Sequence, residues 1–392
     1  MSNHTGEPAR ARRWAIPMRA RSPDEAHRAS TPLELLFDLV FVVAVAQAAG
    51  ELHHGLAEGQ AASAIVSFAM VFFAIWWAWM NFTWFASAYD TDDVPYRLAV
   101  FVQLTGALIL AAGVPQAFEE HDFGIVTAGY TVMRLALVTQ WLRAARSDAH
   151  RRATPYRYAI GISVLQAGWL TLLIVPAGWR PIGFALLVAA ELAVPIWAER
   201  HAGTTWHAGH ITERYGLFTI IVLGESILSA SLAMQSAIQT GDVNGELAPI
   251  IAGGLLIVLS MWWLYFDQPV HDLLISTRTA FVWGYGHLLI FASAAAVGAG
   301  LAVSIDRATH HAEIGAIGAG AAVAIPVAIY LMSLWALHQR PRATSLEQKI
   351  FPPVVALLVL LAPISGQAVL ATGLLLAVLL AIKLASRHRA GA

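Results

Sequence analysis

"TPLELLFDLVFVVAVAQ", residues 31–47, is an apolar stretch that carries two acids, Glu34 and Asp38. The two acids are four residues apart, so in a helix they share one face, with Asp38 one turn deeper. A charged residue inside a bilayer costs about 2.5–3.5 kcal/mol on insertion scales and usually faces the interior of a helix bundle. The stretch therefore predicts a membrane helix whose two acids face other helices.

The composition of the whole chain also favours the membrane. Of its 392 residues, 58% are hydrophobic and 12% are charged, whereas soluble domains carry about 25% charged residues. The net charge of −1 gives no field that attracts nucleic acid, and the lack of cysteine excludes thiolate metal sites. The chain has no Walker loop, GxGxxG, GxSxG or HExxH motif. We therefore expect no cofactor and no metal site; the expected partners are the lipid bilayer and an unknown small solute or ion.

Twelve apolar runs follow the polar N-terminal segment, and most approach the about 20 residues that cross a bilayer. Nearly all Lys and Arg lie between alternate runs, which by the positive-inside rule places both termini in the cytoplasm and the chain in the inner membrane. Termini on one side require an even number of spans; merging the last two runs at "APISGQ" gives eleven as the alternative. We predict an all-α polytopic integral membrane protein with about 12 transmembrane helices. The runs lie near residues 33–50, 61–85, 96–115, 124–142, 157–176, 181–199, 215–236, 248–267, 279–303, 314–337, 350–365 and 367–386.

The chain resembles itself in two places, which predicts an internal duplication. "LELLFDLVFVVAVAQ" aligns with "TERYGLFTIIVLGES", so that Glu34 meets Glu213, and "WWAWMNF" aligns with "WWLYFDQ", so that Asn81 meets Asp267. Two six-helix halves of this kind run in the same direction as parallel repeats. The predicted organisation is a disordered basic cytosolic tail (1–30), a first repeat (31–199), an inner linker (200–212), a second repeat (213–386) and a cytosolic tail (387–392).

The acids inside the apolar runs are the candidate ion- or substrate-binding residues. Thr31 precedes Glu34 at the spacing of a helix-capping box, and Glu213 also opens a run, so both acids have a structural explanation. Asp38 has none. Glu225 lies about ten residues into its run, and Gly224 beside it would let another helix come close. The alternative for Glu225 is a neutral acid that hydrogen-bonds between helices.

Arg134 is the one arginine well inside a run, and it needs a counter-ion. Glu225, Asp38 and Glu191 are the candidates, and the sequence does not choose among them. A structural ion pair that holds helices in register is the alternative to a functional one.

Further polar residues mark the inner ends of the predicted helices. Asn81 and Asp267 end tryptophan-rich runs, and an inner ring of Asp38, Asp267, Arg97 and Arg278 is one interpretation. His287 lies inside a run, where a lone histidine is more often a hydrogen-bonded core residue than a ligand. The other histidines lack the spacing of a metal motif, and we interpret His201, His207 and His210 as ordinary loop residues.

"LELLFDLVFVVAVAQ", "ERYGLFTIIVLGESIL" and "WWLYFD" together resemble the bacterial low temperature requirement A (LtrA) family, over about residues 31–386. The resemblance implies a polytopic membrane protein of a family named for growth at low temperature. It implies no reaction, substrate or catalytic residue. The acids that match the family's pattern are Glu34, Asp38, Glu213, Glu225 and Asp267.

Intramembrane acids in two parallel halves favour proton- or cation-coupled transport of an unknown solute through a site between the halves. Two alternatives stay open. One is a membrane-embedded enzyme that uses the acids on a lipid or isoprenoid. The other is a non-catalytic membrane protein that supports growth in the cold.

Overall fold

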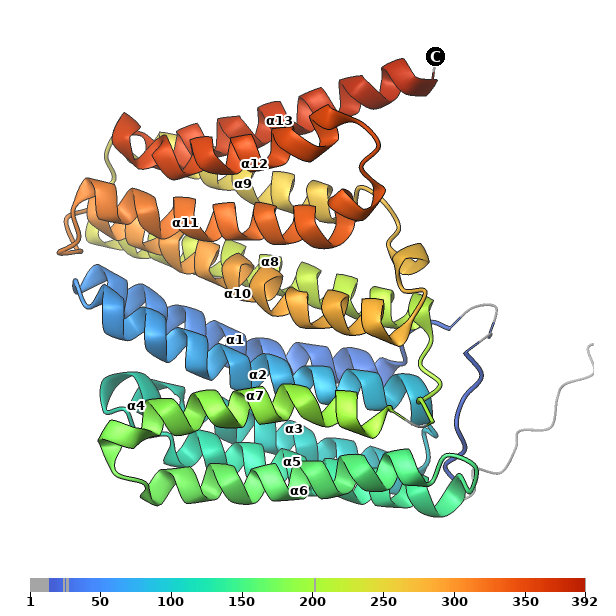
Figure 1. Ribbon diagram of the computed structural model, residues 1–392. Coiled ribbons are helices and arrows are strands. Elements are labelled where there is room, and N and C mark those ends of the chain that lie inside the picture. Colours follow the sequence, from blue (N-terminus) through green and yellow to red (C-terminus); the bar gives the residue numbers. More distant parts are fainter. Residues whose placement is uncertain (1–13, 24, 26–27, 201, 392) are drawn as a thin grey trace, which may run out of the picture.

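The computed structural model describes residues 14–23, 25, 28–200 and 202–391, and all regular secondary structure in these residues is helical. Long helices run across the molecule side by side and end at two faces (Figure 1). The helices of the first half form one group and those of the second half form another, stacked on it. The predicted all-helical membrane fold is confirmed.

The first half contains six long helices and one short one. Pro at the start of α1, α3 and α4 suits the first helical turn, where the backbone N–H has no partner. The helices are α1 (Pro32–Ala57), α2 (Ala61–Tyr89), α3 (Val94–Ala112), α4 (Val114–Glu119), α5 (Gly124–Ser147), α6 (Ala153–Ile174) and α7 (Arg180–Ala198).

The second half contains six long helices in the residues that the structure describes. The apolar runs at 350–365 and 367–386 form two helices, so merging them into one span is wrong. Gly366 between them has a φ of 74°, a conformation that favours glycine and breaks the helix. The helices are α8 (Ala208–Thr240), α9 (Leu247–Phe266), α10 (Thr277–Ala308), α11 (Ala316–Leu334), α12 (Leu346–Leu361) and α13 (Ala368–Gly391).

Eleven helices in the described residues are long and apolar enough to cross a membrane. The remaining long helix, α5, spans 24 residues but carries Arg134, Arg143 and Arg146. It packs between α3 and α6, so neighbouring helices shield much of its polar surface. A total of twelve crossing helices, with α5 among them, stays a prediction.

The two halves pair their helices in a similar succession. In the first half α3 packs on α1 and α5, and α6 packs on α5 and α7; in the second half α10 packs on α8 and α11, and α12 packs on α11 and α13. The internal duplication itself stays a prediction. The halves meet where α1 and α2 contact α8 and α10.

Aromatic rings fill the contact between the halves. Trp79 of α2 stacks on Phe218 of α8, with ring centroids 4.4 Å apart, and meets Phe291 of α10 edge-on at 5.7 Å. All three side chains are fully buried. This packing joins the halves through a continuous apolar core, which excludes water from the polar groups beside it.

The described part of the N-terminal segment lies against the helix ends at one face, which we call the basic face; the other is the opposite face (Figure 1). Met18 is fully buried, and the N–H of Arg21 donates to the Ala88 carbonyl over 2.9 Å. The Arg28 guanidinium donates to the carbonyls of Ala86 (2.7 Å) and Ser87. Both carbonyls lie in the last turn of α2, where the negative end of the helix dipole favours a cation. A disordered tail was expected over 1–30; of that range, residues 1–13, 24, 26 and 27 lie outside the described residues.

Candidate functional site

A group of four charged or titratable side chains, Glu34, Asp38, His210 and Arg214, lies between the halves near the basic face. We call it the interface cluster. Glu34 closes a capping box: its Oε2 accepts from the Thr31 N–H (2.8 Å), and its own N–H donates to the Thr31 hydroxyl (3.3 Å). Its other oxygen, Oε1, lies 3.1 Å from His210 Nε2 and 3.2 Å from Arg214 Nη1. Glu34 therefore both caps α1 and contacts α8.

Asp38 makes the more direct contact across the halves. Arg214 Nη2 and Nε lie 2.5 and 3.1 Å from the two carboxylate oxygens, the two-pronged geometry that arginine makes with acids. Trp79 Nε1 donates to the same carboxylate over 2.7 Å. Asp38 and Arg214 are fully buried. The contact thus ties α1, α2 and α8 together inside the bundle.

Sequence reasoning missed both partners from α8. It placed His210 among ordinary loop histidines, and it did not include Arg214 among the candidate site residues; the structure buries both side chains completely. The spacing of the two residues could have indicated this. His210 and Arg214 are four residues apart, and because α8 begins at Ala208 both lie in the helix and share one face. Glu213 points elsewhere: its Oε1 accepts from the Ser30 N–H over 3.2 Å.

The interface cluster holds more acid than base in direct contact. Two carboxylates share one arginine, so with a neutral His210 the group carries one excess negative charge. A buried charge without compensation is costly. A proton on His210 or on either carboxyl brings the group into balance, which makes proton binding the chemistry that this arrangement supports.

Further charges surround the interface cluster at longer range. Two arginines, Arg21 and Arg28, and one acid, Asp90, interact electrostatically with Glu34, and Tyr96 of α3 is buried beside them. Asp90 follows α2 at the basic face. Burial, together with the charge of Glu34, raises the pKa of Asp90 to about 6. This carboxyl therefore titrates close to neutral pH, next to the interface cluster.

A second buried ion pair lies within the first half, and we call it the first-half pair. Arg134 Nη2 of α5 lies 2.7 Å from Glu191 Oε2 of α7. Trp77 and Trp169 donate their indole N–H groups to the two oxygens of Glu191 over 2.9 and 2.8 Å. Arg134 also donates to the Tyr130 hydroxyl over 3.0 Å. Of the three candidate counter-ions for Arg134, the structure selects Glu191.

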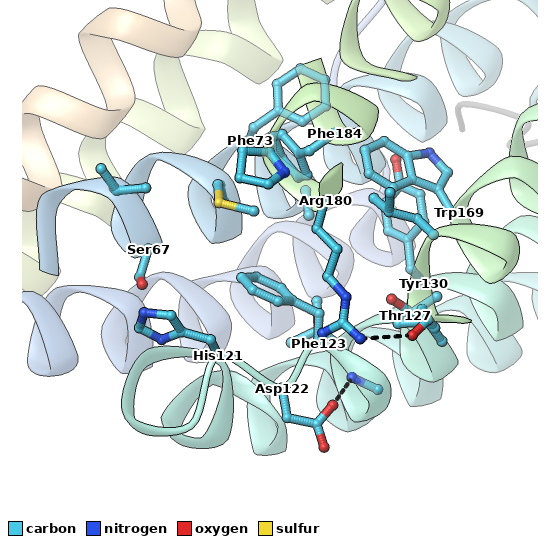
Figure 2. A pocket seen from close by; sticks show the side chains of 18 of the residues that line it. Ser67, Phe73, His121, Asp122, Phe123, Thr127, Tyr130, Trp169, Arg180 and Phe184 are labelled. Carbon is cyan, nitrogen blue, oxygen red and sulfur yellow. Dashed lines mark hydrogen bonds between the residues drawn. The ribbon is translucent and has the colours of Figure 1, made fainter. Parts of the chain in front are cut away.

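A cavity of about 490 Å³ lies between α2, α5, α6 and α7 and opens toward the opposite face; we call it the opposite-face cavity (Figure 2). Tyr130 and Trp169, both hydrogen-bonded to the first-half pair, belong to its wall. Arg180 reaches across it (Figure 2). None of these wall residues was predicted, because an apolar cavity wall has the same composition as a lipid-facing helix surface.

Other predicted site residues lie away from both charge centres. Glu225 is half-buried and accepts a hydrogen bond from Ser229 over 3.2 Å. A side-chain carbon added at Gly224 would meet nothing within 4 Å, so the expected close approach of another helix there is wrong. Asn81 donates to the Trp77 carbonyl in its own helix over 2.7 Å.

The predicted inner ring does not form. Asp267 pairs with Lys383 over 2.7 Å, and Arg97 pairs with Asp92 at the surface over 2.7 Å. Arg278 is exposed. The arginines instead follow the surface near the helix ends, where solvent stabilises their charge at little cost.

His287 is a buried, hydrogen-bonded core residue. One ring nitrogen lies 2.7 Å from the Trp283 carbonyl and the other lies 3.1 Å from the Tyr265 hydroxyl. Within the described residues, no three His, Asp or Glu side chains come together as a potential metal site.

Two comparisons with known proteins bear on this geometry. A family model described as Bacterial low temperature requirement A protein (LtrA) matches residues 29–384, which include both buried charge centres. A protein of Rhizobium meliloti (strain 1021), named Uncharacterized protein RA0937, is 28% identical over 291 residues, covering 70% of this chain and 68% of that protein. The chain is a multi-pass membrane protein, and it belongs to the bacterial low temperature requirement A family.

Proposed function

We propose that this protein is a proton-coupled transporter of a small solute, with the interface cluster as its proton-binding element. The observation that carries the proposal is the charge imbalance of that cluster: Glu34 and Asp38 share Arg214 at a fully buried contact between the halves. A group that needs a proton for balance changes its contacts when the proton leaves. The interface cluster lies between the two halves, so a change in its contacts alters the strength of the contact between the halves.

The direction of the effect follows from the charges. With a proton bound, the group is neutral overall, and Arg214 bridges α1 and α8 without uncompensated charge. Without it, the two carboxylates repel each other across about one helical turn, which weakens the closed arrangement at the basic face. Protonation therefore favours the closed contact, and proton release favours its opening.

The two faces of the protein differ. The opposite-face cavity, within the first half, is open, whereas the N-terminal segment covers the basic face. The halves themselves are joined near both faces, by Asp38 and Arg214 near the basic face and by His53 and Asp306 (2.6 Å) near the opposite face. Secondary transporters built from two halves expose a site to one side at a time. In such a cycle the cavity is the side open to solute, and a path to the basic face requires the contacts between the halves to separate. Cytoplasmic termini, as the positive charges predict, would make the open face the outer one.

The test is current measurement on proteoliposomes adsorbed to a solid-supported membrane. Amino acids, sugars, carboxylic acids and metal cations are applied as a panel at pH 6 and pH 8. We expect at least one class to give a pH-dependent current that Asp38→Asn abolishes. Glu246→Gln, which changes an exposed acid paired with Arg307 at the opposite face, is the matched control and should leave the current intact. A panel without any Asp38-dependent current contradicts the proposal.

A further inference from the structure

The opposite-face cavity has the dimensions of a ligand site. Its volume of about 490 Å³ falls within the about 300–1,000 Å³ typical of small-molecule pockets. Its wall on α2 extends from Ser63 to Ala74, a distance of about 16 Å at 1.5 Å per residue. It therefore reaches from the opposite face toward the middle of the bundle.

The interior of the cavity is aromatic and aliphatic. Such a wall offers few hydrogen bonds and favours an apolar ligand body. Figure 2 shows these rings around an open centre, with the Arg180 side chain crossing it. The aromatic wall residues are Phe73, Phe123, Tyr130, Trp169 and Phe184.

The cavity wall holds one arginine, Arg180, together with Asp122 and His121. The Nε and Nη2 of Arg180 donate to the carbonyls of Val175 (2.9 Å) and Leu173 (3.0 Å), which fixes the guanidinium beside the end of α6. Arg180 is exposed, and among the described residues its Nη1 has no hydrogen-bond partner, so this atom can donate to a ligand. Asp122 is the one acid in the wall, and its Oδ1 accepts from the Gly124 N–H (2.8 Å) at the start of α5. Asp122 thus contacts the N-terminus of α5, which favours its negative charge, and it makes no ion pair with Arg180 among the described residues.

We infer that the opposite-face cavity binds an amphipathic monoanion, with an apolar chain or ring inside and a carboxylate or phosphate on Arg180. The inference rests on the proposed function only in identifying this ligand as the transported solute. Binding itself depends on the cavity and on Arg180 alone.

The floor of the cavity links the ligand to the first-half pair. Tyr130 accepts a hydrogen bond from Arg134, and Trp169 donates one to Glu191. A ligand that shifts either ring also shifts a hydrogen bond to a buried charge. The first-half pair therefore acts as a positioning element that holds these two rings at the cavity floor.

Equilibrium binding on the full chain in phosphatidylcholine nanodiscs tests the inference. The probe is radiolabelled decanoate, and decanol serves as its uncharged counterpart. We expect saturable decanoate binding that Arg180→Gln weakens about tenfold or more, because the variant loses a charge-assisted hydrogen bond to the carboxylate. Arg180→Lys should retain most of the affinity. Arg307→Gln, another arginine at the opposite face, is the matched control and should not change binding.

A second variant tests the apolar part of the site. Ala74→Phe fills the inner end of the cavity while leaving Arg180 in place, so it should abolish decanoate binding. Nanodiscs with added phosphatidylglycerol identify the source of the anion. Competition that depends on Arg180 assigns the site to a membrane lipid, and its absence assigns the site to a free acid.

Two results overturn the inference: no saturable decanoate binding in phosphatidylcholine nanodiscs, or equal weakening by Arg180→Gln and Arg307→Gln. The proposed function fails by a different result. If decanoate binds as expected while Asp38→Asn leaves every current unchanged, the cavity is a ligand site of a protein that does not couple transport through the interface cluster.

Discussion

Two buried arginine–carboxylate centres with similar chemistry differ in their balance of charge. In each, an arginine lies within 2.7 Å of an acid that also accepts an indole N–H: Asp38 from Trp79, and Glu191 from Trp77 and Trp169. The first-half pair matches one arginine with one acid. The interface cluster matches one arginine with two acids and a histidine. The first is complete as an ion pair, whereas the second needs a proton to be complete.

The surroundings of the two centres follow the same division. The first-half pair supports the rings at the floor of the opposite-face cavity, within one half of the molecule. The interface cluster joins α1 to α8 across the halves, beneath the N-terminal segment. The charge-balanced first-half pair thus lies at the wall of the cavity, and the interface cluster, with its excess acid, lies where the halves meet. We therefore expect the first-half pair, in which each charge has its own partner, to be structural, and the interface cluster, in which two acids share one arginine, to respond to protons.

Removal of the arginine from the interface cluster should have the largest effect. Arg214→Gln leaves Glu34 and Asp38 buried on one helix face with no arginine in direct contact. Breaking a buried pair costs about 3–5 kcal/mol, and repulsion between the two acids adds to that cost. Unfolding by sodium dodecyl sulfate in mixed micelles measures the free energy. Arg307→Gln, at an exposed pair, should change it by less than about 1 kcal/mol; comparable losses in the two variants would contradict the assignment.

The first-half pair should respond less strongly to the same change. Arg134→Gln leaves the single acid Glu191, whose two indole hydrogen bonds remain, so we expect a loss of about 3–5 kcal/mol in the same assay. The double variant Arg134→Gln with Glu191→Gln removes both charges and should recover part of that loss. A double variant less stable than Arg134→Gln would show that Glu191 is stabilised by groups other than Arg134. The two residues would then not compensate each other's charge.

Neutralising one acid should distinguish the two centres most clearly. Asp38→Asn leaves Arg214 paired with Glu34 and removes the excess negative charge, so we expect a loss of at most about 1 kcal/mol. Glu191→Gln leaves Arg134 without a counter-ion and should cost several times more. Parallel unfolding measurements on the two variants make the comparison. Equal losses would mean that the interface cluster holds no excess charge.

The sequence predicted the type of fold because an apolar run that crosses a bilayer must satisfy its backbone hydrogen bonds internally, which a helix does. It also identified Asp38 as an acid without a capping role, and it named Glu191 among the partners for Arg134. These inferences need only the position of a residue within its run. The functional roles of the acids stay predictions.

The rest of the candidate site depends on contacts between distant segments. Asp38 and Arg214 are 176 residues apart, and nothing within either run indicates their pairing. His210 was assigned to a loop because α8 begins before its apolar run does. The opposite-face cavity is built from four helices whose inward and lipid-facing surfaces have the same composition. The lipid around a membrane protein is apolar, so its lipid-facing residues are as apolar as those that line a cavity. In a soluble protein the outer surface is polar, and this difference would distinguish the two.

The smallest expected effect is a pH dependence at the basic face, beside the interface cluster and far from the first-half pair. Burial raises the pKa of Asp90 to about 6, so the folded protein binds a proton there more tightly than the unfolded chain does. Stability from this group therefore increases as pH falls through 6. Between pH 7.5 and 5.5 the gain is about 0.8 kcal/mol by linkage. Wild type should gain this much relative to Asp90→Asn in the same unfolding assay, because the amide does not titrate. Glu246→Gln should behave as wild type; a gain of equal size in Asp90→Asn would place the titrating group elsewhere.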